Sequence, residues 1–234
     1  VSRISGFLQG EDSLNTIRAF QQMGVEIERN QDRVCVKGAG LHGLTASTTD
    51  LEMGNSGTAM RLMLGLLAGQ SFDSRMVGDE SLSSRPMLRV IEPLQAMGAL
   101  IASESGGRAP LQVRASPGLT AIEYDMPVAS AQVKSCLLLA GLYADGETVV
   151  REPAPTRDHS ERMLRAYGCE VTSVGREIRM PAGQQLSACD VEVPADISSA
   201  AFFMVAASIA PGSDITLQHV GVNPTRTGVV DVLK

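Results

Sequence analysis

The sequence predicts an α/β domain in which three βαβαββ repeats lie around a pseudo-threefold axis, with apolar helices buried inside. Two patterns, each present three times, predict this fold. One is a small polar start, an apolar helix and a glycine or proline–glycine stop. The other is an amphipathic helix, a glycine and a short strand. Gly24, Gly98 and Gly168 mark matching points of the second pattern, so the period is about 70 residues, too long for a solenoid unit.

The amphipathic helices are predicted within 13–27, 86–101 and 160–171. In the first of them, Leu14, Ile17, Phe20 and Met23 recur at helical spacing and fall on one face. Such a helix needs burial on that face only. Each is followed by a further short strand with alternating residues.

The apolar helices are predicted within segments 54–69, 128–150 and 197–221. They are apolar on all sides and therefore need to be buried on all sides, which three similar units around an axis would provide. Close packing between these helices explains Gly65 and Gly141, because a glycine inside a helix costs about 1 kcal/mol relative to alanine.

We assign the repeats to about 1–72, 73–145 and 146–213, and we expect 214–234 to begin the return into a second domain. The chain starts at Val1 rather than at methionine, and its last residues fall inside a predicted helix. We therefore expect an excised segment of a longer protein.

Composition restricts the core and the class of protein. Aromatic residues make up 3% and tryptophan is absent, so the core must be built from aliphatic residues and methionine. A net charge of −6 argues against a general nucleic-acid binder. No apolar run approaches the roughly 20 residues that span a bilayer. The four cysteines lack metal-type spacing, and we expect reduced structural thiols in a cytoplasmic protein that needs no metal or cofactor.

Small polar residues stand at the start of all three apolar helices. In the predicted arrangement these starts point the same way, and their free N–H groups and helix dipoles attract anions. We expect them to form one rim that binds an anion; the alternative is simple N-capping, worth about 1 kcal/mol each. The residues are Asn55, Ser56, Gly57, Thr58, Ser130, Gln132, Ser198 and Ser199.

Three arginines occupy corresponding positions before helices: Arg85, Arg157 and Arg226. The dipole repels a cation at a helix start, and a bound phosphate or carboxylate would relieve this repulsion. A lone surface arginine is the alternative. For His159 we favour a structural or ligand-orienting role over acid–base chemistry.

Two charged residues, Arg61 and Lys134, lie just inside apolar helices. A charge there needs a partner or an open mouth at the helix end. For Arg61 we expect a structural ion pair with a carboxylate such as Asp50 or Asp196.

Five segments in the same order resemble the 5-enolpyruvylshikimate-3-phosphate synthase family, class II branch: LEMGNSGTAMRL, GDESLSSRPM, PVASAQVKSCLLLAGL, PTRDHSERML and NPTRTG. The resemblance covers essentially the whole chain. It implies transfer of the carboxyvinyl group of phosphoenolpyruvate to the 5-hydroxyl of shikimate 3-phosphate, in aromatic amino-acid biosynthesis. It also implies a monomer of two domains of three βαβαββ units, with this chain mainly the N-terminal-half domain.

The resemblance implies roles for individual residues. Shikimate 3-phosphate would be bound by Ser130, Ala131, Gln132, Arg157 and Thr58. Phosphoenolpyruvate would be bound by Gly57, Arg85 and Gln132, with Asn55 and Arg61 supporting the loop. The family's Lys, Ser and Arg of its N-terminal segment, and the Asp and Glu of its acid–base chemistry, have no match here. We therefore expect no catalytic residue in this chain and no turnover by it alone.

Two other functions stay open. A UDP-N-acetylglucosamine enolpyruvyl transferase has the same fold, but its reactive cysteine has no counterpart in the loop that holds Arg85. A non-catalytic phosphate-binding module could use the same repeats. An RNA 3′-phosphate cyclase shares the repeated topology, and the acidic balance argues against it.

Overall fold

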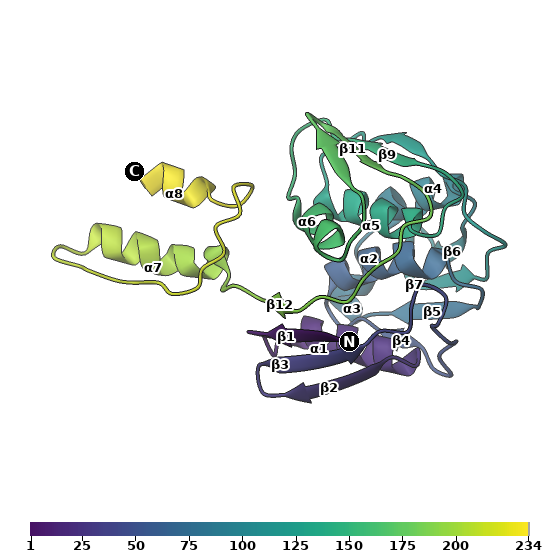
Figure 1. Ribbon diagram of the computed structural model, residues 1–234, viewed down its shortest axis with the longest axis horizontal. Helices are drawn as coiled ribbons and strands as arrows, with labels where there is room; N and C mark the ends of the chain where they lie inside the picture. The colour runs from purple at the N-terminus through teal and green to yellow at the C-terminus, as the bar shows by residue number, and fades with distance from the viewer. Residues whose placement is uncertain (234) are drawn as a thin grey trace.

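A computed structural model describes residues 1–233 as three four-stranded mixed sheets with helices packed among them (Figure 1). The strands are β1 (Ser2–Ser5), β2 (Glu26–Asn30), β3 (Arg33–Lys37), β4 (Leu51–Glu52), β5 (Ser74–Val77), β6 (Leu100–Glu104), β7 (Arg108–Arg114), β8 (Glu123–Asp125), β9 (Thr148–Arg151), β10 (Thr172–Val174), β11 (Glu177–Met180) and β12 (Val191–Glu192). The helices are α1 (Glu11–Gln22), α2 (Gly57–Ala68), α3 (Glu80–Ser83), α4 (Leu88–Ala96), α5 (Ala131–Gly141), α6 (His159–Ala166), α7 (Ile197–Ile209) and α8 (Gly228–Leu233).

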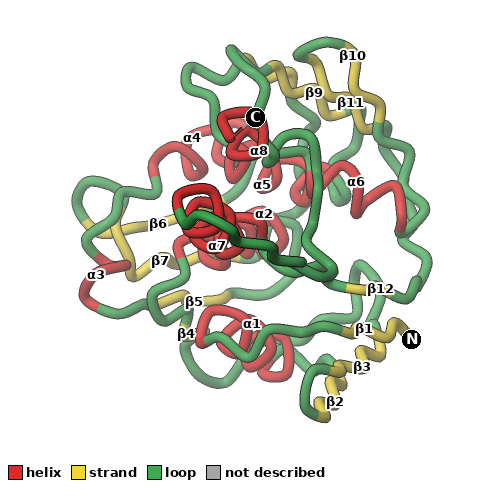
Figure 2. The backbone as a smooth tube through the Cα atoms, turned by 90° about the vertical axis from the view of Figure 1, so that its left-hand side faces the viewer, coloured by secondary structure: helices red, strands yellow, loops and turns green. Residues whose placement is uncertain are grey.

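The three sheets share one topology. Their strand orders are β12-β1-β3-β2, β4-β5-β7-β6 and β8-β9-β11-β10. In each sheet the first two strands are parallel and the others pair antiparallel. Figure 2 shows the sheets placed around α2 and α5. The predicted fold class, repeated mixed α/β units around buried helices, is confirmed.

The first sheet is completed by a strand from far along the chain. Strand β12 pairs parallel to β1, with Val191 opposite Ile4 and Glu192 opposite Ser5. The sheets therefore group residues 2–37 with 191–192, then 51–114, then 123–180. This grouping is offset from the repeats as counted along the sequence, whose boundaries stay a prediction.

Helices α2 and α5 form the most extensive helix–helix contact of the described chain. A Cβ on Gly65 would lie 2.1 Å from the backbone oxygen of Cys136, so only glycine permits this approach. On α5, a Cβ on Gly141 would lie 2.6 Å from Thr148 Oγ1. The expected helix–helix packing is confirmed for Gly65, whereas Gly141 packs closely against strand residues, Thr148 of β9 and Met180 of β11.

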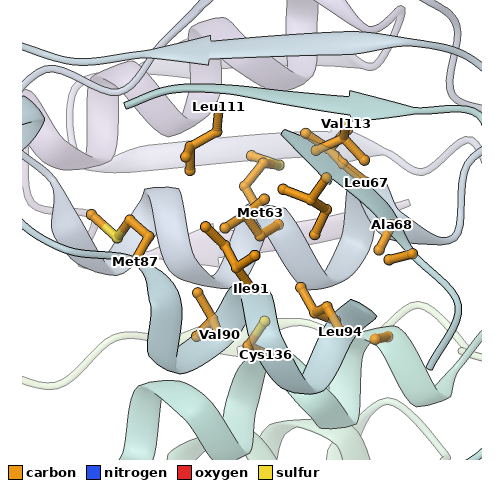
Figure 3. Packing of buried hydrophobic residues seen from close by; sticks show 14 of the residues in the cluster. Met63, Leu67, Ala68, Met87, Val90, Ile91, Leu94, Leu111, Val113 and Cys136 are labelled. Carbon is orange, nitrogen blue, oxygen red and sulfur yellow. The ribbon is translucent and has the colours of Figure 1, made fainter. Parts of the chain in front are cut away.

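Figure 3 shows aliphatic and sulfur-containing side chains around α2 and α4, with no aromatic ring among those drawn. Met63, Leu67, Ile91 and Cys136 belong to this main cluster. Burial raises the pKa of the Cys136 thiol to about 12, as expected for an unreactive structural cysteine. A second cluster lies between α5, α6 and β11.

The amphipathic helices are close to their predicted ranges, as α1, α4 and α6. Gly24, Gly98 and Gly168 follow them with φ of +87°, +95° and +93°. This left-handed conformation ends a helix and favours glycine. The matching points chosen in the sequence are therefore structurally equivalent. No helix of the described residues is long and apolar enough to span a bilayer.

The third apolar helix, α7, is not buried, and the prediction that all three would be is wrong. Figure 1 shows α7 beside α8 and apart from the sheets. Its Phe202, Phe203 and Ile209 are 79%, 62% and 77% exposed. Helices α2 and α5 each connect two parallel neighbouring strands, which brings them back onto a sheet. Strand β12 precedes α7, but its parallel neighbour β1 lies earlier in the chain. Helix α7 therefore does not connect two neighbouring strands, and no such connection places it on the sheet.

Candidate anion-binding site

The first turns of α2 and α5 lie side by side and are linked by side chains. Gln132 Nε2 donates to Thr58 Oγ1 at 2.7 Å, and Arg61 Nη1 donates to Gln132 Oε1 at 2.9 Å. Gln132 therefore connects both helix starts. Because each start carries free backbone N–H groups and the positive end of a dipole, two such ends meet at one rim.

Each of these starts is capped by a serine. Ser56 Oγ accepts from the N–H of Ala59, and Ser130 Oγ accepts from the N–H of Val133, both at 3.3 Å. The capping interpretation is thus correct for these two residues. A cap satisfies one of the four donors that a helix start leaves free, so capping and anion binding are compatible here.

The loop between β5 and α4 is organised by Asn55. Its Nδ2 donates to Asp79 Oδ2 at 2.8 Å, and its Oδ1 accepts from Arg85 Nη2 at 2.7 Å. Arg85 Nη2 also lies 3.1 Å from Ser81 Oγ. The hydrogen bond from Asn55, followed by that from the Leu82 N–H, lowers the pKa of Asp79. These contacts hold the Arg85 guanidinium beside the start of α2.

Gly57 lies between two guanidinium groups. A Cβ at this position would be 2.9 Å from Arg61 Nη1 and 3.3 Å from Arg85 Nη1. Gly57 is buried and is the first residue of α2. The absence of a side chain lets both cationic groups approach the positive end of this helix.

The expected ion pair of Arg61 with Asp50 or Asp196 is wrong. Asp50 pairs with Arg75, and Asp196 lies 3.5 Å from Arg226. Arg61 donates to neutral acceptors instead, the amide of Gln132 and the carbonyl of Gly57, the latter at 3.3 Å. Sequence could show that Arg61 needs a partner but not which group is near.

The two arginines of the rim, Arg61 and Arg85, form no direct ion pair with a carboxylate of the described residues, although Asp79 lies near Arg85. Burial lowers the pKa of Arg61, and the charges of Arg85 and Arg89 lower it further. Sequence reasoning missed Arg89, which follows Arg85 at helical spacing. A phosphate or carboxylate would relieve this repulsion.

Arg157 lies in the loop before α6 and is exposed. His159 is the first residue of α6 and is also exposed. The loop is close to α5, because Ser160 Oγ lies 2.6 Å from Ser135 Oγ. The structure thus brings the Arg157 loop to the same helix that carries Ser130, Ala131 and Gln132.

Ser198, Ser199 and Arg226 form no hydrogen bond with the starts of α2 and α5 among the described residues. The N–H groups of Ser198 and Ser199 donate to the Asp196 carboxylate, and Arg226 Nη2 donates to Ser198 Oγ. The loop that holds Arg226 also contacts the Arg157 loop, because Asn223 Nδ2 donates to Asp158 Oδ1 at 2.7 Å. The hydrogen-bonded rim therefore joins two helix starts, those of α2 and α5, and the membership of the α7 start stays a prediction.

The rim is suited to binding anions. Its cations and helix starts match phosphate and carboxylate groups. Asp79 accepts hydrogen bonds and its lowered pKa keeps it ionised at neutral pH, so it is no proton donor. Two surface hollows of about 600 and 280 Å³ lie elsewhere, at the β12-β1-β3-β2 and β4-β5-β7-β6 sheets, and the rim residues line neither.

Comparison with known proteins identifies relatives along the whole chain. The sequence model of the family described as EPSP synthase (3-phosphoshikimate 1-carboxyvinyltransferase) matches residues 1–234. The 3-phosphoshikimate 1-carboxyvinyltransferase of Alkalilimnicola ehrlichii is 63% identical over the full chain, and that of Methylococcus capsulatus is 58% identical. The chain covers 52% and 54% of these two proteins.

A solved structure gives the same result. The EPSP synthase of Acinetobacter baumannii superposes with a TM-score of 0.94 at 53% identity, over 99% of this chain and 52% of that one. The chain thus spans about half the length of the relatives it matches. The sequence motifs, the sheet topology and these matches together show that the chain belongs to the EPSP synthase family.

Proposed function

We propose that this chain supplies part of both substrate sites of an enzyme that transfers the carboxyvinyl group of phosphoenolpyruvate to the 5-hydroxyl of shikimate 3-phosphate. The relatives are named for this activity, and they are about twice as long as this chain. The whole reaction is therefore assigned to a protein that includes this chain and further residues.

The observation that carries the proposal is the rim at the paired starts of α2 and α5. Both substrates are anions, and the rim joins two helix starts with Arg61 and Arg85, which have no carboxylate partner in the described chain. Arg85 and Gly57 would hold phosphoenolpyruvate. Ser130, the Ala131 backbone and Gln132 would hold shikimate 3-phosphate, together with Thr58 and Arg157.

We also propose that the chain alone is inactive. The reaction protonates the methylene of phosphoenolpyruvate, adds the sugar hydroxyl and eliminates phosphate, which requires a proton donor and acceptor. The rim offers electrostatic positioning instead. The acid–base groups would come from residues outside this chain.

The test uses this chain completed with the remaining residues of the 63% identical relative, called here the completed protein. Arg85→Gln should raise the KM for phosphoenolpyruvate at least 10-fold, and Arg157→Gln should raise the KM for shikimate 3-phosphate by a similar factor. Each loss corresponds to about 1.4 kcal/mol or more. Arg75→Gln is the control, because Arg75 pairs with Asp50 outside the rim.

Two results would contradict the proposal. One is equal, weak affinity of the completed protein for shikimate 3-phosphate and inorganic phosphate in calorimetry, which favours a non-catalytic phosphate-binding module. The other is measurable enolpyruvyl transfer by residues 1–234 alone, which would overturn the assignment of the acid–base groups.

A further inference from the structure

A lysine and two glutamates form a buried cluster beneath the rim. Lys134 Nζ lies 2.9 Å from Glu152 Oε1 and 2.7 Å from Glu161 Oε1. The side chains of all three are at least 94% buried. One buried lysine therefore faces two carboxylates, and Glu161 Oε2 has no hydrogen-bond partner among the described residues.

The two glutamates stand at the two ends of the loop that carries Arg157. Glu152 follows β9 directly, and Glu161 lies in the first turn of α6. Between them, Thr156 Oγ1 donates to Glu152 Oε1. Lys134 thus holds both ends of a short loop from one point, while Arg157 itself remains exposed.

The lysine is equally well connected to the rim. It is the fourth residue of α5, and its backbone N–H donates to the carbonyl of Ser130 at 3.2 Å. Two residues before it, Gln132 links α5 to α2. The neighbouring Ser135–Ser160 contact of 2.6 Å joins α5 to α6 a second time, beside the Lys134–Glu161 ion pair. The cluster therefore fixes the start of α5 relative to the Arg157 loop.

Stability alone gives a weak reason for such a cluster. Burying charges carries a large desolvation cost, and apolar side chains of similar volume are often at least as stabilising. An ammonium that hydrogen-bonds to two carboxylates favours one relative placement of the three segments that carry these groups. An apolar cluster of the same size specifies that placement less strictly. Here those segments carry Ser130 and Arg157.

We propose that Lys134 is a positioning residue that, through Glu152 and Glu161, sets the distance between the α5 start and Arg157 so that both contact one sugar phosphate. This inference rests on the proposed function, because it takes shikimate 3-phosphate as the ligand. The lysine does not touch the ligand; it acts through Ser130 on one side and Arg157 on the other.

The test neutralises the cluster in the completed protein while keeping side-chain size. Lys134→Met combined with Glu152→Gln and Glu161→Gln should raise the KM for shikimate 3-phosphate about 10-fold or more. We expect kcat and the KM for phosphoenolpyruvate to stay within about threefold, because the Arg85 side of the rim is not altered. Lys134→Arg, which retains the charge, should recover most of the loss.

The chain offers a matched control in the β8-β9-β11-β10 sheet, which packs beside this cluster. Arg179 also faces two carboxylates, with Nη1 2.7 Å from Glu147 and Nε 2.7 Å from Glu177, but these side chains are 29–44% exposed. Arg179→Met with Glu147→Gln and Glu177→Gln removes the same charges, and should change each KM less than twofold.

The outcomes are distinguishable. An unchanged KM for shikimate 3-phosphate in the folded neutral variant, or equal increases for both substrates, would overturn the positioning role. If that variant does not fold, Glu161→Gln alone decides by the same KM comparison. If the unsubstituted completed protein shows no transfer, the proposed function fails instead. Calorimetry with shikimate 3-phosphate then still tests whether the neutral variant, but not its control, loses affinity.

Discussion

Helices α2 and α7 share a sequence plan but not an environment. Both start at a polar cap, continue through apolar residues and end near a glycine. Yet Leu67 of α2 is fully buried, while Phe203 of α7 is 62% exposed. The difference follows from connectivity, because α2 joins two parallel strands of one sheet and α7 does not. A helix that is apolar on all sides therefore indicates that it needs to be buried, but it does not indicate which segment covers it.

The largest expected effect comes from truncating equivalent apolar side chains. Leu67→Ala should lower the free energy of unfolding of residues 1–234 by about 3 kcal/mol, because it leaves a cavity in the core. Phe203→Ala should change it by less than about 0.5 kcal/mol, because the ring is exposed in this chain. Urea denaturation measures both. Equal losses would show that α7 is packed against the core in solution.

A smaller effect is expected at the α2–α5 contact. Gly65→Ala places a methyl group against the Cys136 carbonyl, 2.1 Å away in the present geometry, and should cost about 1–3 kcal/mol. The intrinsic helix preference of alanine works in the opposite direction by about 1 kcal/mol. Ala206→Val on the exposed part of α7 is the control, expected to stay near zero in thermal unfolding. A stabilised Gly65→Ala protein would refute the close contact.

The next comparison concerns the first residue of two helices. Gly57→Ala should raise the KM for phosphoenolpyruvate in the completed protein about 3- to 10-fold, since a Cβ displaces Arg61 and Arg85; this equals about 0.7–1.4 kcal/mol. Stability should barely change, because the displaced atoms are ends of flexible side chains. Gly228→Ala at the start of α8 meets nothing within 4 Å and should leave the KM unaltered.

The smallest expected effect is the pH dependence of the N-terminal cap of α7, compared with that of α2. The N–H of Ser198 is the main cause of the lowered pKa of Asp196, which caps α7, whereas Ser56 on α2 does not titrate. Because the folded pKa lies below the unfolded value of about 3.9, the cap stabilises α7 above that pH and is lost as pH falls through the folded pKa. Hydrogen exchange would show this as a loss of protection of the Ser198 and Ser199 amides, relative to their intrinsic exchange rates, from pH 5 to 3, and the loss should be absent in Asp196→Ser. Exposure keeps the effect well under 1 kcal/mol.

Local patterns allowed much of the fold to be predicted. The helical spacing of α1, the glycines with positive φ and the close approach at Gly65 all depend on nearby residues or on a repeated plan. The burial of α7 could not be predicted, because it depends on which strand follows. The pairing of β12 with β1 joins distant segments and left no local signal.

The site shows the same division. The polar starts of α2 and α5 and the position of Arg85 were visible as sequence motifs. The neutral partners of Arg61 were not, since nothing local favours Gln132 over a carboxylate. For Lys134 the need for a partner was clear, but Glu152 and Glu161 are two among many acidic residues.

The pairing of β12 with β1 has a practical consequence for anyone shortening this chain. Cutting before Val191 would leave the backbone donors and acceptors on one side of β1 without partners and open to a strand from another molecule. Expression of the first 190 residues should therefore give self-associating material. Val191 and Glu192 pair with β1 and cover this edge of the sheet. The shortest segment that stays monomeric should therefore include β12.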